Sequence, residues 1–96
     1  MKEIELLAKH NGRDAIFRKA KEECAELIVA LSQFEEFGKA DRYATIGDIC
    51  EEIADVEIMC DQLKYILHGK NITEQHKAEK IERQLTRFGL DRKDTK

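Results

Sequence analysis

Two short runs of carboxylates have a spacing that could hold a metal ion. Residues 22–26 read EECAE and residues 51–55 read EEIAD. Residues three apart share one side of an α-helix, so each run presents a pair of carboxylates together. Four carboxylates that converge repel one another and stay ionised only beside a cation. Oxygen ligands of this kind suit Mg²⁺ or Mn²⁺ and leave coordination positions for water and phosphate oxygens.

The two pairs also have a defined position relative to the expected apolar stripes of their helices. On the first of these helices the stripe consists of Ala20, Cys24, Leu27, Leu31 and Phe34. At about 100° per residue, Glu23 lies roughly 70° from the centre of its stripe and Glu52 roughly 65° from the centre of its own. Glu26 and Asp55 lie further along the same flanks. Antiparallel packing of the two helices is therefore expected to bring the four carboxylates together.

The elements that must position these residues are all predicted to be helical. Helices are expected at about 2–10, 13–36, 46–68 and 73–88, within one domain spanning 1–96, with a frayed tail over 90–96. Asn11 is expected to cap the second helix, and Thr45 the third with Asp48 in the capping-box position. Gly69 should end the third helix, Thr73 should open the fourth, and Gly89 should stop it.

The third helix has the most regular apolar pattern, and it predicts a homo-oligomer. Its apolar residues alternate steps of three and four, as a packed seam requires. They are Ile46, Ile49, Ile53, Val56, Cys60, Leu63 and Leu67. Ala54, Ile58 and Tyr65 lie on a different side. A small helical domain cannot cover two apolar sides of one helix, so a second subunit is expected against it.

Composition narrows the classes of function and partner. From residue 22 to 57 there are 11 acids against 2 bases, and from 64 to 96 there are 9 bases against 5 acids. A DNA-binding surface needs one continuous basic face, so no nucleic-acid partner is expected. The apolar stretches are too short to span a bilayer and the N-terminus lacks a signal-peptide pattern, so no membrane partner and a cytoplasmic location are expected.

Cysteine and histidine spacing excludes two other kinds of metal site. The three cysteines, Cys24, Cys50 and Cys60, include no C-x₂-C pair and are expected to be small buried apolar residues. None of the three histidines has a Glu three residues before it. The E-x-x-H pairs of di-iron bundles are therefore missing.

The paired acidic motifs resemble those of the MazG-like nucleoside triphosphate pyrophosphohydrolases, an all-helical group that also includes dimeric dUTPases. The group's E-E-x-x-E motif is similar to Glu22-Glu23-x-x-Glu26, and its E-x-x-D motif to Glu52-x-x-Asp55. A K-x-x-R motif is similar to Lys80-x-x-Arg83. The resemblance runs from about residue 11 to residue 88.

The resemblance implies an all-α, four-helix MazG-like bundle that forms a homodimer or tetramer. The implied reaction is Mg²⁺-dependent hydrolysis of a nucleoside or deoxynucleoside triphosphate to the monophosphate and pyrophosphate, by attack of metal-activated water at the α-phosphorus. The implied metal ligands are Glu23, Glu26, Glu52 and Asp55. Glu22 would orient or activate water, beside Glu23, or help to hold a second ion.

The basic stretch is expected to meet substrate phosphates. By resemblance Lys80 and Arg83 would contact phosphate oxygens, and Arg87 would replace a second Arg that related sequences carry where this chain has Gln84. Ordinary i, i+4 pairing on an exposed helix would give a similar pattern of charges. The base and the sugar of the substrate are left open.

Two other functions are consistent with the same residues. One is a non-enzymatic helical interaction module whose acids form a solvated face. The other is a related protein that binds a nucleotide without hydrolysing it, although the presence of all four carboxylates argues against this. Stabilisation by Mg²⁺ beyond the effect of matched ionic strength would separate a metal site from a solvated face.

Overall fold

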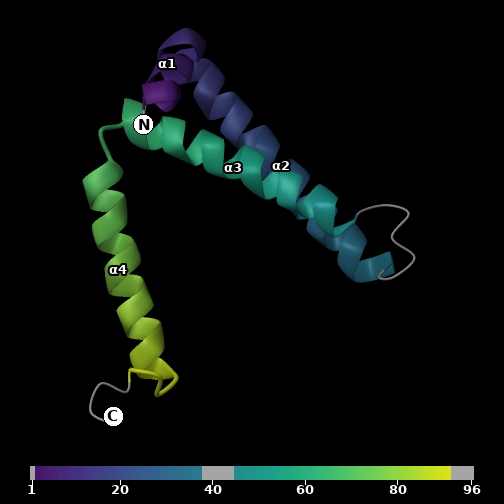
Figure 1. The fold of residues 1–96 in the computed structure, drawn as a ribbon, viewed down its shortest axis with the longest axis vertical. Helices are drawn as coiled ribbons and strands as arrows, with labels where there is room; N and C mark the ends of the chain where they lie inside the picture. Colours follow the sequence, from purple (N-terminus) through teal and green to yellow (C-terminus); the bar gives the residue numbers. More distant parts are fainter. Residues whose placement is uncertain (1, 38–44, 92–96) are drawn as a thin grey trace.

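A computed structural model describes residues 2–37 and 45–91, and within this part of the chain every regular element is an α-helix. The helices are α1 (Lys2–Asn11), α2 (Arg13–Phe37), α3 (Ile46–Ile66) and α4 (Lys70–Arg87) (Figure 1). The all-α class and the four helices are confirmed. The boundary between α3 and α4 is the main difference, because α3 ends two residues earlier and α4 begins three residues earlier than predicted.

The break between α1 and α2 is made by Gly12 rather than by an Asn11 cap. Gly12 has a φ of +85°, in the left-handed region that favours glycine. Asn11 belongs to α1, and its side-chain amide donates to Oε1 of Gln62 at 2.9 Å. Gln62 is only 2% exposed, so this hydrogen bond satisfies a buried amide that would otherwise be costly. The predicted capping role of Asn11 was wrong because its side chain is used to join α1 to α3.

The predicted capping box at the start of α3 is confirmed. The Asp48 amide donates to Thr45 Oγ1 at 3.1 Å, and the Thr45 amide donates to Asp48 Oδ2 at 2.9 Å. At the other end, the Gly69 amide donates to the Lys64 carbonyl and the His68 amide to the Tyr65 carbonyl. These two bonds form a Schellman motif in which His68, with a φ of +53°, takes the position expected for Gly69. Gly69 instead precedes the first residue of α4.

The end of α4 was predicted correctly. Gly89 has a φ of +68°, and the Leu90 amide donates to the Leu85 carbonyl at 2.7 Å. The Gly89 amide donates to the Thr86 carbonyl, which completes a second Schellman motif. A glycine without a Cβ adopts this conformation at little steric cost, so the sequence signal was reliable here.

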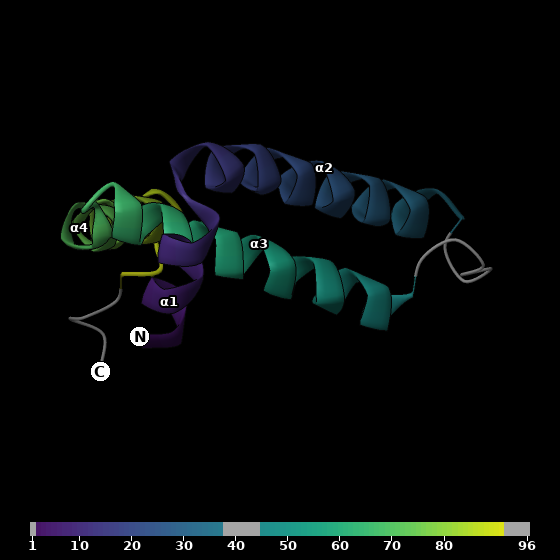
Figure 2. The ribbon, with the colours of Figure 1, turned by 90° about the horizontal axis from the view of Figure 1, so that it is seen from above.

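α2 and α3 form an antiparallel hairpin, and α1 packs across one end of it (Figure 2). The hydrophobic core lies at that end. Ile16 is fully buried and packs with Ala8 of α1 and Met59 of α3. Partly buried side chains surround this group, namely Ala20, Leu63, Tyr65 and Ile66. The core therefore fixes how α1, α2 and α3 lie relative to one another.

The packing face of the hairpin is rotated from the predicted stripes. On α3 the side chains that face the rest of the chain are Glu52, Val56, Met59, Leu63 and Ile66, all buried or half-buried. This face lies roughly 65° from the centre of the predicted stripe, at about 100° per residue. Ile46, Ile53 and Leu67 consequently remain exposed. Cys24, Cys50 and Cys60 are exposed as well, so their predicted burial is not found within one chain.

α4 projects away from the other helices, so one chain does not form a closed four-helix bundle (Figure 1). Of the other helices, α4 contacts α3 alone, and none of its residues is buried. The radius of gyration is 17.2 Å, whereas a compact chain of this length would have a value of about 12–13 Å. The bundle expected from the sequence is therefore not completed by intrachain packing, because nothing in the described chain covers α4.

Candidate metal centre

Three carboxylates from two helices meet in the middle of the hairpin. Glu23 comes from α2, and Glu52 and Asp55 come from α3. One oxygen from each lies within 4.8 Å of the others. Glu23 and Glu52 are half-buried, whereas Asp55 is exposed. Among the described residues, these three could hold a cation with oxygen ligands alone. The sequence predicted a fourth ligand, Glu26, which is not in this group.

Glu23 and Glu52 lie closer to the centre of the interhelical contact than the sequence suggested. Glu23 follows the buried Ile16 by seven residues and precedes the buried Ala30 by seven, so all three share one side of α2. Glu52 precedes the buried Met59 by seven residues on α3 in the same way. The predicted flank positions were wrong, because the helices pack through a face rotated toward these carboxylates.

At this position one carboxylate oxygen of each glutamate is shielded from water and gains no hydrogen bond from the protein in exchange. Oε1 of Glu23 and Oε1 of Glu52 are inaccessible to solvent and have no hydrogen-bond partner. Loss of hydration raises the pKa of both carboxyl groups, and the negative charges of Glu26 and Asp55 raise it further. Buried polar atoms are normally satisfied, and two orphaned oxygens on neighbouring carboxylates form an environment that a hard cation would stabilise.

The other two predicted acidic residues lie beside this cluster. Glu26 raises the pKa values of both Glu23 and Glu52, so it is close to the two central carboxylates. It is exposed and is not one of the three residues whose oxygens converge. Glu22 is exposed on α2 and is likewise outside the group.

A groove adjoins the acidic cluster on the side of Glu26. It has a volume of about 490 Å³, and its lining includes Glu26 of α2 and Glu52 of α3. Its other lining residues are Ala25, Val29, Ala30, Gln33 and Asp48. No motif in the sequence pointed directly to this groove. The spacing of Asp48, four residues before Glu52, was the available signal, but Asp48 was interpreted only as a helix cap.

The predicted phosphate-binding residues are not brought to the cluster within one chain. Lys80, Arg83 and Arg87 lie on α4, which makes no contact with α2 in the described part of the chain. Arg83 and Arg87 instead line a shallow hollow on α4 itself, with Glu79, Glu82 and Thr86. The acidic and basic motifs are therefore separated, because α4 turns away from the hairpin after Gly69.

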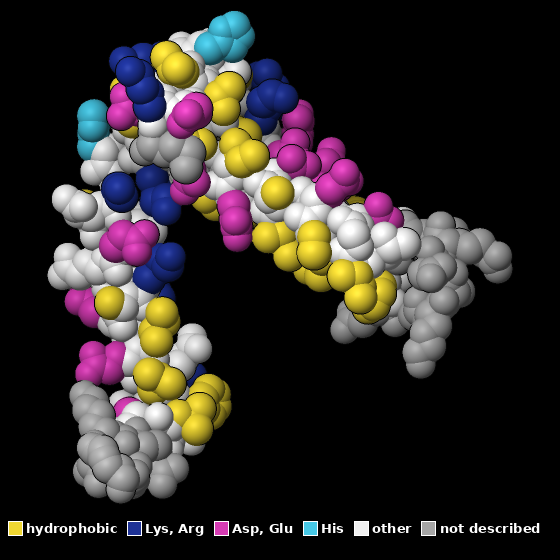
Figure 3. All heavy atoms as spheres, in the orientation of Figure 1, with side chains coloured by type: hydrophobic (Ala, Val, Ile, Leu, Met, Phe, Trp, Pro, Cys, Tyr) yellow, Lys and Arg dark blue, Asp and Glu magenta, His cyan; other side chains and the backbone are white. Residues whose placement is uncertain are grey.

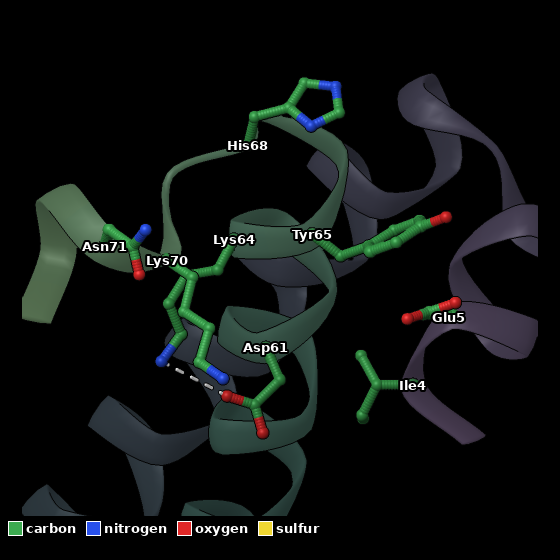
Figure 4. Close-up of a pocket in the computed structure, with 8 residues that line it drawn as sticks. All are labelled: Ile4, Glu5, Asp61, Lys64, Tyr65, His68, Lys70 and Asn71. Atoms are coloured by element: carbon green, nitrogen blue, oxygen red, sulfur yellow. Dashed lines mark ion pairs between the residues drawn. The ribbon is translucent and has the colours of Figure 1, made fainter. Parts of the chain in front are cut away.

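A second hollow lies where α1, α3 and the start of α4 meet (Figure 4). It is lined by Ile4, Glu5, Asp61, Lys64, Tyr65, His68, Lys70 and Asn71. Lys64 Nζ lies 3.3 Å from Asp61 Oδ1 and 3.8 Å from Glu74 Oε2, so its charge is already paired. Charges of both signs line this hollow, and it has no group of orphaned polar atoms comparable to the acidic cluster.

Two further observations bear on the setting of the site. Among the described helices, none is both long enough and apolar enough to cross a bilayer. Comparison of the chain with protein-family models, with curated proteins and with solved structures found no match.

Proposed function

We propose that this chain is a Mg²⁺-dependent nucleoside triphosphate pyrophosphohydrolase, which converts a nucleoside or deoxynucleoside triphosphate to the monophosphate and pyrophosphate. The observation that carries the proposal is the pair of orphaned oxygens on Glu23 and Glu52, beside the carboxylate of Asp55. The spacing of these residues, which resembles the acidic motifs of MazG-like enzymes, supplies the reaction type. Mn²⁺ has similar ligand preferences and is expected to substitute.

The acidic residues would have two roles, binding the ion and orienting water. Glu23, Glu52 and Asp55 would hold the ion, and Glu26 would complete the ligand set from the neighbouring turn of α2. When bound, Mg²⁺ would neutralise charge on the phosphates and promote attack of water on the α-phosphorus. Glu22 would hold and orient that water or contribute to a second ion. No nucleophilic side chain is needed for this reaction.

The groove next to the cluster would hold the rest of the nucleotide. Val29 and Ala30 offer apolar contact, and Gln33 offers an amide that can both donate and accept hydrogen bonds. Ligand sites commonly combine such an apolar lining with a few polar groups. In this proposal the base would lie toward the end of the hairpin that is remote from α1.

The direct test is to measure pyrophosphate release from a panel of ordinary, deoxy and modified triphosphates with Mg²⁺. The expected products are the monophosphate and pyrophosphate. Release of free phosphate without a coupled pyrophosphatase would indicate cleavage at the γ-phosphorus and would contradict the assigned reaction. Activity is expected to rise above neutral pH and to be poorly supported by Ca²⁺, which prefers longer bonds and looser geometry.

A non-enzymatic interaction module remains the second candidate, because the described chain exposes many large apolar side chains, including Ile28, Ile46 and Phe88. In that case the acids would form a solvated face. Millimolar Mg²⁺ would then stabilise the protein no more than NaCl of the same ionic strength, and no triphosphate would be hydrolysed.

A further inference from the structure

The groove beside the acidic cluster offers a ligand many hydrogen-bond acceptors and few donors. Its lining includes three carboxylates, those of Glu26, Asp48 and Glu52. An ionised carboxylate only accepts hydrogen bonds. The amide of Gln33 is the one side-chain donor in the lining, and the remaining lining residues are apolar. A ligand that fits this lining must therefore supply donors of its own.

No basic residue on the neighbouring stretches of α2 and α3 compensates these acids. Residues 22–37 and 45–63 contain no Lys, Arg or His. Figure 3 shows acidic side chains along one edge of the hairpin, whereas basic side chains gather around α1 and on α4. A cation at the acidic cluster would compensate the nearest carboxylates. Asp48 lies four residues before Glu52, about 6 Å further along α3, so its charge remains for the ligand.

The capping box holds the carboxylate of Asp48 at the edge of the groove. Asp48 Oδ2 accepts a hydrogen bond from the Thr45 amide at 2.9 Å, and the Asp48 amide donates to Thr45 Oγ1 at 3.1 Å. The other carboxylate oxygen keeps its lone pairs. A side chain that is already held in one conformation loses little further freedom when a ligand binds. Asp48 is therefore a preorganised acceptor as well as a helix cap.

Gln33 lines the same groove from the opposite helix. It is half-buried and follows Glu26 by seven residues, or about 10 Å along α2. The groove thus begins at the acidic cluster and ends at two polar side chains, Gln33 on α2 and Asp48 on α3. With the triphosphate at the cluster, as the proposed function requires, the base of the nucleotide reaches these two side chains.

We propose, as an extension of the proposed function, that Asp48 and Gln33 select nucleotides whose base carries an exocyclic amino group, namely cytosine or adenine. The amino group of either base donates to the free oxygen of Asp48. The Gln33 amide donates to the ring nitrogen next to that amino group. Uracil and hypoxanthine have a carbonyl oxygen in place of the amino group, and the carboxylate of Asp48 repels it. Their deaminated edge is therefore rejected by an unfavourable contact as well as by a lost hydrogen bond.

Binding of nucleoside monophosphates tests this selection without turnover. NMR titrations with dCMP, dUMP, dAMP and dIMP in Mg²⁺ buffer compare each base with its deaminated form. The dissociation constants of dCMP and dAMP should be about 5–20-fold lower than those of dUMP and dIMP, respectively. This ratio is modest because Asp48 is exposed and Gln33 is only half-buried. The side-chain amide signal of Gln33 should shift when dCMP is added.

Asp48→Asn is the decisive variant. The asparagine oxygen can still accept from the Thr45 amide, while an NH₂ donor replaces the second acceptor. The preference for the amino-bearing base should fall to about 1 or reverse. Thr45→Ala is the matched control, because it weakens the capping box but leaves the carboxylate in the groove, and it should keep the preference. Gln33→Leu should weaken binding of both members of each pair. Helical circular dichroism checks that each variant is folded.

The inference is overturned if wild-type protein does not bind dCMP more tightly than dUMP, or if folded Asp48→Asn keeps the wild-type preference. Its failure is distinct from failure of the proposed function. Hydrolysis of dCTP and dUTP with equal kcat/KM, and equal binding of their monophosphates, would overturn the base selection alone. Selective binding of dCMP and dAMP by a protein that releases no pyrophosphate from any triphosphate would support the base selection and refute the assigned reaction.

Discussion

The packing face between α2 and α3 changes character along its length. At the end covered by α1, Ile16 and Met59 pack hydrocarbon against hydrocarbon. About two helical turns further along, Glu23 and Glu52 occupy equivalent positions and leave two buried oxygens without partners. The first region stabilises the hairpin and the second opposes it, because carboxylates that lose hydration favour separation. Neighbouring stretches of the same interface therefore supply the stability of the hairpin and the carboxylates of the proposed metal site.

Glu52→Gln should have the largest effect, because it removes a ligand charge from the centre of the cluster while keeping the shape of the side chain. We expect kcat/KM to fall on the order of 10³-fold, with the helical circular dichroism unchanged. Glu57→Gln, an exposed position on another side of α3, is the matched control and should retain activity. Near-normal turnover in Glu52→Gln would remove this residue from the metal centre.

Ile16→Ala tests the opposite region. Truncating a fully buried isoleucine should lower the free energy of unfolding by about 2–4 kcal/mol, measured by urea denaturation. Leu6→Ala, at a position of α1 that is 60% exposed, should change it by less than about 0.5 kcal/mol. Equal effects of the two substitutions would show that the hydrophobic core is not where the structure places it.

Mg²⁺ should reverse the destabilising character of the carboxylate region. Saturating Mg²⁺ should raise the free energy of unfolding by about 1–3 kcal/mol relative to NaCl of equal ionic strength, because the ion binds only the folded site. The same titration of Glu23→Gln is the control, and its response should be largely lost. A wild-type response no greater than that of the variant would favour the solvated acidic face.

The smallest expected effect is the pH dependence of stability in metal-free buffer. The pKa values of Glu23 and Glu52 are raised above the ordinary 4.5, so the folded state binds protons at a higher pH than the unfolded state does. Their contribution should therefore make the protein less stable as the pH rises from about 4.5 through the raised values. Denaturation at several pH values should show this slope reduced in Glu23→Gln/Glu52→Gln. An unchanged slope would assign the pH dependence to other groups.

Local signals in the sequence were sufficient for the helices and for most of the acidic cluster. The capping box at Thr45 and the glycine at position 89 fixed helix ends because each depends on only a few neighbouring residues. Glu23, Glu52 and Asp55 were found because their spacing is a helical property. The path of α4 was not predictable in this way, since it depends on the turn after α3.

The rotated packing face shows a second limit of local patterns. The stripe from Ile46 to Leu67 contains the greatest number of apolar residues on α3, yet it is only partly covered in the structure. Periodicity identifies which residues avoid water but does not say which neighbour covers them. Part of this stripe packs within the chain and part of it is exposed, so the centre of the stripe lies between the packed face and the exposed face of α3. Glu52 consequently looked like a flanking residue although it lies within the contact.

The turn between α3 and α4 sets the rotational phase of α4 as well as its direction. Its left-handed His68 is fixed by the hydrogen bonds of the Schellman motif, and the Lys64–Glu74 ion pair crosses it. One residue inserted here would rotate α4 by about 100° about its own axis without changing any side chain in it. The length of this turn therefore determines which side of α4 faces the rest of the chain. Insertions or deletions here are expected to be tolerated far less than the solvent exposure of the turn would suggest.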